Sequence, residues 1–324
     1  MAFCKSCKHF FILVLLASFQ QFVFAAWPDK PVKIVVPYPP GGNVDVAARI
    51  IAPELSNIFG QPFIVDNKAG AGGMIAGEYV ANSPADGYTL FMAANGPLLF
   101  SPIIFGKNAY KWNKDFSPIS SVSYTPLVLQ VKADLPVKNF AEFLALAKKD
   151  PNKLNMASPG AGTTNHLASE LLQSLTGARW STVHYKGNAP ATADLIGGQV
   201  DFNFDQISVA LPFIKDGKSR GLAVTSPQRI SSIPDIPTFA EVGVPGMVAV
   251  TFTGILAPKG TPNVTVDRLS DAIQKVLQQP AIKEKFEKLG AEARGSSPKD
   301  FTNYLSDEDS KWTPIIKSAR IKAD

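Results

Sequence analysis

The chain has 324 residues and carries 32 Lys and Arg against 27 Asp and Glu, a formal net charge of +5. Its basic residues are scattered, with no run beyond Lys148-Lys149, so the sequence predicts no nucleic-acid partner. The length exceeds that of most single domains and favours two lobes.

The first 25 residues have the pattern of a secretory signal peptide. Lys5 and Lys8 precede an apolar run, Phe10–Ala17, and small residues lead to a predicted cleavage site after Ala25. A transmembrane anchor is the alternative, but the run is far shorter than the ~20 residues that span a bilayer. We therefore expect the mature protein in the periplasm, with its charge lowered from +5 to +3 because two lysines are removed.

Apolar β-type runs alternate with amphipathic helical runs along the mature chain, which predicts an α/β fold with helices on both faces of its sheets. The first series has strands at Val32–Val36, Phe63–Val65 and Tyr88–Ala93, and helices at Val44–Phe59 and Met74–Ala81. The second has strands at Leu127–Val131, Leu154–Ala157, Ser181–Tyr185, Val200–Phe204 and Leu222–Thr225, and helices at Phe140–Lys148, Asn165–Leu175, Pro190–Ile196 and Leu211–Lys215.

The last part of the chain begins with a long apolar strand, Val248–Leu256. Three helices follow it, at Val264–Leu277, Ala281–Leu289 and Pro298–Ser318. These helices have no sheet of their own, so we expect them to pack on the first lobe. The chain then crosses between lobes twice, which divides it into lobe 1 (residues 26–124 and 251–324) and lobe 2 (residues 125–250), with a cleft between them.

Two glycine-rich turns lie between a strand and a helix of the first series, at Pro37–Asp45 and at Asn67–Gly73. Glycines let the backbone approach a ligand closely, and the first N–H groups of the following helix point outward at its positive dipole end. The sequence therefore predicts two anion-binding helix N-termini. Tight turns without a ligand are the alternative.

Nucleotide binding is a poorer interpretation of these turns. A dinucleotide fingerprint needs an acidic residue at the end of the next strand, whereas Asp86 lies in the turn before it. Neither turn has the Gly-Lys-Ser/Thr of a phosphate-binding loop. The first turn also contains no Lys or Arg, so it predicts a carboxylate held by helix dipoles and neutral donors. Lys68 is expected to be a solvated surface side chain, and Asp45 to cap its helix.

Other candidate residues follow strands that end at the same edge of the sheets. Thr163 and Thr164 either cap the helix that begins near Asn165 or contact the ligand. Asp205 either pairs with an ammonium group of a zwitterionic ligand or caps the next turn. The complete set of predicted ligand-binding residues is Tyr38, Pro40, Gly41, Gly42, Asn43, Gly70, Ala71, Gly72, Gly73, Asn95, Gly160, Gly162, Thr163, Thr164, His166 and Asp205.

Cleavage of the signal removes both cysteines, Cys4 and Cys7, and leaves His166 and His184 as the only histidines. No metal or cofactor is expected, because no cysteine remains and the histidines lack a ligand spacing. The sequence has no Gly-x-Ser-x-Gly motif either, so it predicts no serine hydrolase. His166 is expected to support a loop, although an exported enzyme that uses His166 with Asp205 is an alternative function, and a ligand-sensing module is another.

Short motifs along the mature chain together resemble the Bug or TctC-like extracytoplasmic solute receptors of tripartite tricarboxylate transporters. They are Trp27–Pro31, Tyr38–Gly42, Asn67–Gly73, Asp86–Leu90, Gly162-Thr163, Tyr185–Gly187, Gly197–Asp201, Pro234–Thr238 and Ala257-Pro258. The resemblance implies a type II periplasmic binding fold, with two α/β lobes that close about a hinge on a small organic acid, and delivery of that acid to membrane transporter subunits. It also implies carboxylate-binding loops at Tyr38–Asn43 and Gly70–Gly73, and we expect a monomer.

Overall fold

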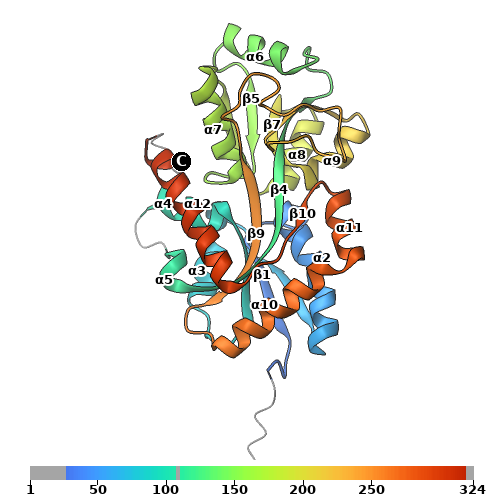
Figure 1. The fold of residues 1–324 in the computed structure, drawn as a ribbon. Coiled ribbons are helices and arrows are strands. Elements are labelled where there is room, and N and C mark those ends of the chain that lie inside the picture. Colours follow the sequence, from blue (N-terminus) through green and yellow to red (C-terminus); the bar gives the residue numbers. More distant parts are fainter. Residues whose placement is uncertain (1–26, 107–109, 319–324) are drawn as a thin grey trace, which may run out of the picture.

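The computed structural model describes residues 27–106 and 110–318. The predicted signal peptide, residues 1–25, lies outside the described residues. Two lobes lie one above the other, joined by two long antiparallel strands, β4 (Phe116–Lys132) and β9 (Val250–Pro258) (Figure 1). The α/β fold with two lobes that the alternation of elements predicts is confirmed.

Lobe 1 contains a mixed sheet in the order β2-β1-β3-β9-β4. Its other strands are β1 (Val32–Val36), β2 (Phe63–Asn67), β3 (Thr89–Ala94) and β10 (Glu292–Ala293), which pairs with β4. Its helical elements are α2 (Asn43–Phe59), η1 (Ala71–Gly73), α3 (Met74–Ala81), η2 (Gly96–Phe100), α4 (Ser101–Phe105), α5 (Trp112–Asp115), α10 (Asn263–Gln278), α11 (Pro280–Lys288) and α12 (Pro298–Ser318). Because β1, β2 and β3 are parallel, their carboxyl ends meet at one edge, which faces lobe 2.

Lobe 2 contains the second sheet, in which the end of β4 pairs with β7 and β8 and the parallel strands β7, β5 and β6 follow in that order. These strands are β5 (Asn155–Ser158), β6 (Ser181–His184), β7 (Phe202–Gln206) and β8 (Ser219–Val224). The helices are α6 (Phe140–Lys149), α7 (Thr164–Thr176), α8 (Asn188–Ile196) and α9 (Ile207–Lys215). The carboxyl ends of the parallel strands face lobe 1, as the position of ligand sites in open α/β sheets requires.

The C-terminal helices pack on lobe 1, as predicted. Apolar side chains of α10, such as Leu269 and Ile273, share one core with Ile51 and Leu55 of α2. On the other face of the sheet, Phe301 of α12 packs against Phe252 of β9, with ring centroids 5.8 Å apart. These helices carry apolar residues at helical spacing because one side of each helix is buried against a face of the lobe 1 sheet.

The predictions missed the first half of β4. Pro118 and Pro126 interrupt a run of serines there, a composition typical of a loop. In the structure the strand accommodates register shifts beside Pro118, and its buried residues Ser121 and Ser123 form hydrogen bonds with distant segments of the chain. For example, Ser121 donates from Oγ to the Arg294 carbonyl oxygen at 2.7 Å. Tertiary hydrogen bonds thus override the local preference of the sequence.

The strand β4 changes its partners from β9 to β7 and β8 between Pro126 and Leu127. This point lies two residues beyond the predicted lobe boundary after Tyr124, and the return strand β9 begins at Val250. The division into residues 26–124, 125–250 and 251–324 stays a prediction.

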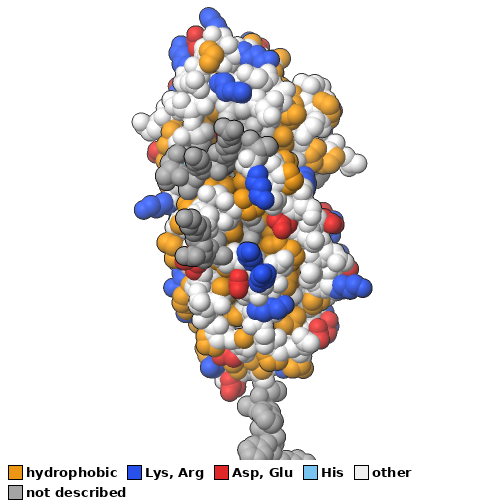
Figure 2. Space-filling view, turned by 90° about the vertical axis from the view of Figure 1, so that its left-hand side faces the viewer, with side chains coloured by type: hydrophobic (Ala, Val, Ile, Leu, Met, Phe, Trp, Pro, Cys, Tyr) orange, Lys and Arg blue, Asp and Glu red, His pale blue; other side chains and the backbone are white. Residues whose placement is uncertain are grey.

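None of the helices in the described part of the chain is long and apolar enough to cross a membrane. Figure 2 shows one face of the molecule, on which basic and acidic side chains are intermingled. This matches the scattered charges of the sequence.

Candidate functional site

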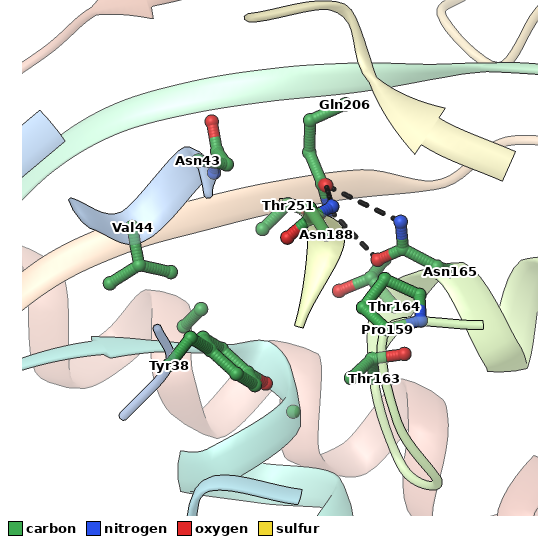
Figure 3. Close-up of a pocket in the computed structure, with 12 residues that line it drawn as sticks. Tyr38, Asn43, Val44, Pro159, Thr163, Thr164, Asn165, Asn188, Gln206 and Thr251 are labelled. Atoms are coloured by element: carbon green, nitrogen blue, oxygen red, sulfur yellow. Dashed lines mark hydrogen bonds between the residues drawn. The ribbon is translucent and has the colours of Figure 1, made fainter. Parts of the chain in front are cut away.

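A small cavity lies between the lobes where strands of both sheets end. Its lining residues come from both lobes and are uncharged: Tyr38, Asn43, Val44, Ala94, Gly96, Pro159, Thr163, Thr164, Asn165, Asn188, Gln206 and Thr251 (Figure 3). The cavity gives the centre of a water molecule about 20 Å³, which is room for about one water. The structure therefore shows the two lobes closed on each other.

Four of the described helices begin at this cavity. Asn43 is the first residue of α2, Thr164 of α7 and Asn188 of α8, while Gln206 is the N-cap of α9. The first N–H groups of a helix have no partner within it, and the helix dipole makes its N-terminus an attractive position for an anion. The cavity is thus suited to negative charge although no cationic side chain lines it.

Asp45 holds the first glycine-rich turn in place, but it is not the predicted cap of α2, because the N-cap is Gly42 and has no side-chain cap hydrogen bond. The Asp45 carboxylate accepts hydrogen bonds from the Gly41 N–H at 2.9 Å, from Arg49 Nε at 2.9 Å and from Asn67 Nδ2 at 2.9 Å. These contacts hold the Asp45 pKa below its ordinary value, although burial acts the other way. The Gly41 amide is therefore used inside the turn, and Gly41 and Pro40 are both exposed outside the cavity.

Asn43 carries a buried polar atom without a hydrogen-bond partner. Its side chain is 4% exposed and lines the cavity. The Oδ1 atom accepts a hydrogen bond from Ser208 Oγ of lobe 2 at 2.6 Å, whereas Nδ2 is buried and has no partner among the described residues. A buried donor without an acceptor costs about 1–3 kcal/mol. A ligand acceptor, such as a carboxylate oxygen, would satisfy it.

Tyr38 and the two predicted threonines also line the cavity, so the structure brings together four of the predicted residues: Tyr38, Asn43, Thr163 and Thr164. Burial raises the pKa of Tyr38 well above its ordinary value, so its hydroxyl stays a neutral donor. Thr163 caps α7, accepting the His166 N–H at 3.3 Å and donating to the Gly160 carbonyl oxygen at 2.9 Å. Thr164 is left as a hydroxyl at the cavity wall.

Asp205 is not among the residues that line the cavity, and its pairing with an ammonium group of the ligand stays a prediction. The carboxylate is 0% exposed and accepts hydrogen bonds from Asn188 Nδ2, from Thr192 Oγ1 at 2.7 Å and from the Gln206 N–H at 2.9 Å. Burial raises the Asp205 pKa to about 7, although the hydrogen bonds from Thr192 and Asn188 lower it. Asp205 therefore lies behind Asn188, and Asn188 is the residue that lines the cavity.

His166 is also placed behind the wall. Its Nδ1 accepts the Gly162 N–H at 3.2 Å, and its ring lies against His184 with centroids 4.7 Å apart. Burial, together with the neighbouring His184, lowers the His166 pKa to about 3, so the ring is neutral. His166 therefore supports the turn that contains Gly160 and Gly162, and neither glycine lines the cavity.

The second glycine-rich turn is not among the residues that line this cavity either, and ligand contact by Gly70, Ala71, Gly72 and Gly73 stays a prediction. A Cβ on Gly72 would lie 2.6 Å from the Ala161 carbonyl oxygen of lobe 2, and one on Gly73 would lie 2.6 Å from Pro97. Gly72 has a φ of +60°. The glycines of this turn are therefore required where the lobes and neighbouring loops touch, and lobe closure explains them.

Asn95 is the last of the predicted residues that the structure places elsewhere. It is fully buried in lobe 1, where Oδ1 accepts the Phe252 N–H at 3.0 Å and Nδ2 donates to Glu308 Oε2 at 3.1 Å. Asn95 therefore fixes the loop of Gly96, which does line the cavity.

Gly42 lies against the cavity wall, because a Cβ there would be 3.1 Å from Asn188 Oδ1.

Eight lining residues are not in the predicted set of ligand-binding residues: Val44, Ala94, Gly96, Pro159, Asn165, Asn188, Gln206 and Thr251. A signal existed for two of them. Asn188 follows Gly187 after a predicted strand, the same strand-glycine-helix order as in the first turn, and Gln206 directly follows Asp205. Among the described residues, no cluster of three or more His, Cys, Asp or Glu could hold a metal ion.

Known sequences are similar to this chain over most of its length. The sequence model of the TctC family, described as "Tripartite tricarboxylate transporter family receptor", matches residues 47–321. The protein BugT of Bordetella pertussis is 35% identical over 297 residues, which cover 91% of this chain and 91% of BugT.

Solved structures are similar over nearly the whole chain. A protein of R. palustris with adipate has a TM-score of 0.89 at 35% identity, covering 92% of this chain and all of that chain. MatC from Rhodopseudomonas palustris with bound malate has a TM-score of 0.85 at 32% identity, covering 90% of this chain and all of MatC. The periplasmic binding protein BugD has a TM-score of 0.88 at 33% identity, covering 92% of this chain and all of BugD. The predicted periplasmic binding fold is confirmed.

Proposed function

Since the chain belongs to the family of tripartite tricarboxylate transporter receptors, which are periplasmic solute-binding proteins and not enzymes, we propose that it captures a small organic carboxylate between its two lobes. The chain hands this ligand to membrane transporter subunits and is exported to the periplasm by its N-terminal signal. The observation that carries the proposal is the unpartnered Asn43 Nδ2 at the start of α2, in a cavity where four helices begin.

The ligand's carboxylate would lie at the N-terminus of α2. There the Asn43 and Val44 amides precede the first hydrogen bond within the helix, from the Val46 N–H to the Gly42 carbonyl oxygen at 2.9 Å. Charge-assisted hydrogen bonds from these amides and from Asn43 Nδ2 would replace the hydration of the anion. The similar proteins with adipate and with malate support a dicarboxylate among the ligands.

Lobe 2 would complete the site on closure. Ser208 of α9 holds Asn43, and the α7 and α8 N-termini bring Thr164 and Asn188 to the opposite wall. Because the closed cavity has room for about one water, an acid enters only when the lobes part. Ligand affinity therefore depends on how much the acid stabilises a closed arrangement.

The direct test is to identify what the protein carries. Small molecules released from protein purified from the periplasm are analysed by mass spectrometry, and each candidate acid is then titrated in a calorimeter and recovered. We expect a carboxylic acid that binds reversibly and is recovered unchanged. A co-purifying molecule without an acid group, or chemical turnover of the acid, would contradict the proposal.

A further inference from the structure

The lobe 2 wall of the cavity contains a chain of three side-chain amides whose orientation is fixed at both ends. Asn165, Gln206 and Asn188 are hydrogen-bonded in that order, and Figure 3 shows them side by side across the cavity from Tyr38 and Val44. An amide presents a donor on one side and an acceptor on the other, so its orientation decides what it can recognise.

One end of the chain is the main-chain carbonyl of Phe204. A carbonyl oxygen only accepts, so Asn165 must turn Nδ2 toward it, at 2.7 Å. Asn165 Oδ1 then faces Gln206 and accepts from Gln206 Nε2 at 3.0 Å. Gln206 Nε2 also donates to Thr251 Oγ1 at 2.8 Å, while Gln206 Oε1 accepts from Asn165 Nδ2 at 3.3 Å and from Asn188 Nδ2 at 2.7 Å.

The other end is the buried Asp205 carboxylate. Asn188 Nδ2 donates both to Asp205 Oδ1 and to Gln206 Oε1, the latter at 2.7 Å. Asp205 Oδ1 also accepts the Gln206 N–H at 2.9 Å, and Gln206 Oε1, as an amide oxygen, can only accept. Turning the Asn188 amide over would bring its oxygen against two oxygen acceptors. Both ends of the chain therefore impose the same orientation.

Both N–H hydrogens of the Asn188 side-chain amide are used in the hydrogen bonds to Asp205 and Gln206. The amide oxygen of Asn188 therefore faces the cavity. This oxygen accepts no hydrogen bond from the described residues, and it lies on the side of lobe 1, 3.1 Å from where a Cβ on Gly42 would be. Gly42 is the N-cap of α2, the helix whose first amides would hold the carboxylate. A donor that reaches Asn188 Oδ1 therefore belongs to a ligand atom close to that carboxylate.

We propose that Asn188 Oδ1 is a specificity-determining acceptor, which selects acids with a hydroxyl group on the carbon next to the carboxylate over the same acids without it. The inference rests on the proposed function and adds to it the class of acid. An unsubstituted acid would cover Asn188 Oδ1 without pairing it, and a buried unpaired acceptor is costly. A 2-hydroxy acid would pair with both groups, with the buried Asn43 Nδ2 through its carboxylate and with Asn188 Oδ1 through its hydroxyl.

The test uses matched pairs of acids and the full mature chain. Calorimetry compares succinate with malate, adipate with 2-hydroxyadipate, propionate with lactate, and phenylacetate with mandelate, using both enantiomers of each hydroxy acid. In the pair or pairs that bind, we expect one enantiomer of the hydroxy acid to bind at least about fivefold more tightly than the unsubstituted acid. Equal or tighter binding of the unsubstituted acid overturns this inference and leaves the proposed function intact.

Two variants locate the effect. In Asn188→Ala the preference for the hydroxy acid should fall to about one, because the acceptor is gone. Ser208→Ala removes the contact to Asn43 and leaves Asn188 unchanged. In this variant the affinities for both acids should fall by the same factor, and the preference for the hydroxy acid should persist. A preference retained in a folded Asn188→Ala, checked by circular dichroism, overturns the inference.

A crystal structure of the natural protein with the tighter acid is independent of how the variants fold. It should place the ligand hydroxyl within hydrogen-bond distance of Asn188 Oδ1, and a hydroxyl placed elsewhere overturns the inference. If none of the tested acids binds and the co-purifying molecule has no acid group, the proposed function and the inference are both overturned.

Discussion

The two glycine-rich turns of lobe 1 are similar in sequence, but in the structure they have different neighbours. Each follows a parallel strand and opens a helix. The first presents Asn43 and the start of α2 to the cavity, whereas the second presents Gly72 to the Ala161 carbonyl of lobe 2. Glycine allows close approach in both cases, but in one the neighbour is the cavity and in the other it is the opposite lobe. A glycine-rich turn by itself therefore predicts a close approach and leaves the identity of the neighbour open.

The largest expected effect is on the first turn. Asn43→Leu removes the unpartnered donor and the contact to Ser208, so we expect the dissociation constant of the bound acid to rise about 100-fold, or about 3 kcal/mol. Calorimetry measures it. Asn57→Leu is the matched control, because Asn57 lies on the same helix but is exposed. The affinity of this variant for the acid should equal that of the wild type. Equal affinities of the two variants would show that the first turn is as remote from the ligand as the second.

The next effect concerns the wall that faces the first turn. Burial raises the Asp205 pKa to about 7 from an ordinary value of 3.8, so between these values the folded protein holds a proton that the unfolded chain has released. The contribution of Asp205 to wild-type stability should therefore fall as pH rises from 5 to 7, by about 2 kcal/mol. Asp205→Asn cannot titrate, so its free energy of unfolding relative to wild type should rise by that amount over the same range.

Urea unfolding of the wild type and of Asp205→Asn at pH 5, 6, 7 and 8 measures this difference. Asp216→Asn is the control, because Asp216 is an exposed residue paired with Lys218. Its difference from wild type should not vary with pH. A constant difference for Asp205→Asn as well would mean that Asp205 is already ionised at pH 5.

The smallest expected effect is on the second turn. Gly72→Ala would place a Cβ 2.6 Å from the Ala161 carbonyl oxygen, in a backbone with a φ of +60°. The substitution should therefore oppose closure of the lobes and raise the dissociation constant of the acid about tenfold. Gly60→Ala has a similar φ, +68°, with nothing within 4 Å of the new atom. It should cost stability and leave affinity unchanged.

Small-angle scattering with saturating acid then separates the two roles of glycine. Gly72→Ala should remain more extended than the wild type, whereas Gly60→Ala should become as compact. A compact Gly72→Ala that still binds weakly would instead place the second turn at the ligand.

Sequence alone predicted the fold and part of the site. Alternating β and helical runs predicted the two α/β lobes, and the position of Asn43 after a strand and two glycines predicted a helix N-terminus at the cavity. These features are local, because residue spacing decides periodicity and helix starts. Tyr38, Thr163 and Thr164 were found for the same reason, since each lies just beyond the end of a strand.

Only the tertiary structure decided which polar groups reach the cavity and which form hydrogen bonds inside the protein instead. Asp205 and Asn188 both follow the pattern of candidate ligands, but the carboxylate binds the Asn188 amide and remains behind it. In the same way lobe closure brings Gly72 to Ala161, a contact between residues far apart in the sequence. Hydrogen bonds and steric contacts between distant segments depend on how the lobes fold together, and no local pattern of residues carries that information.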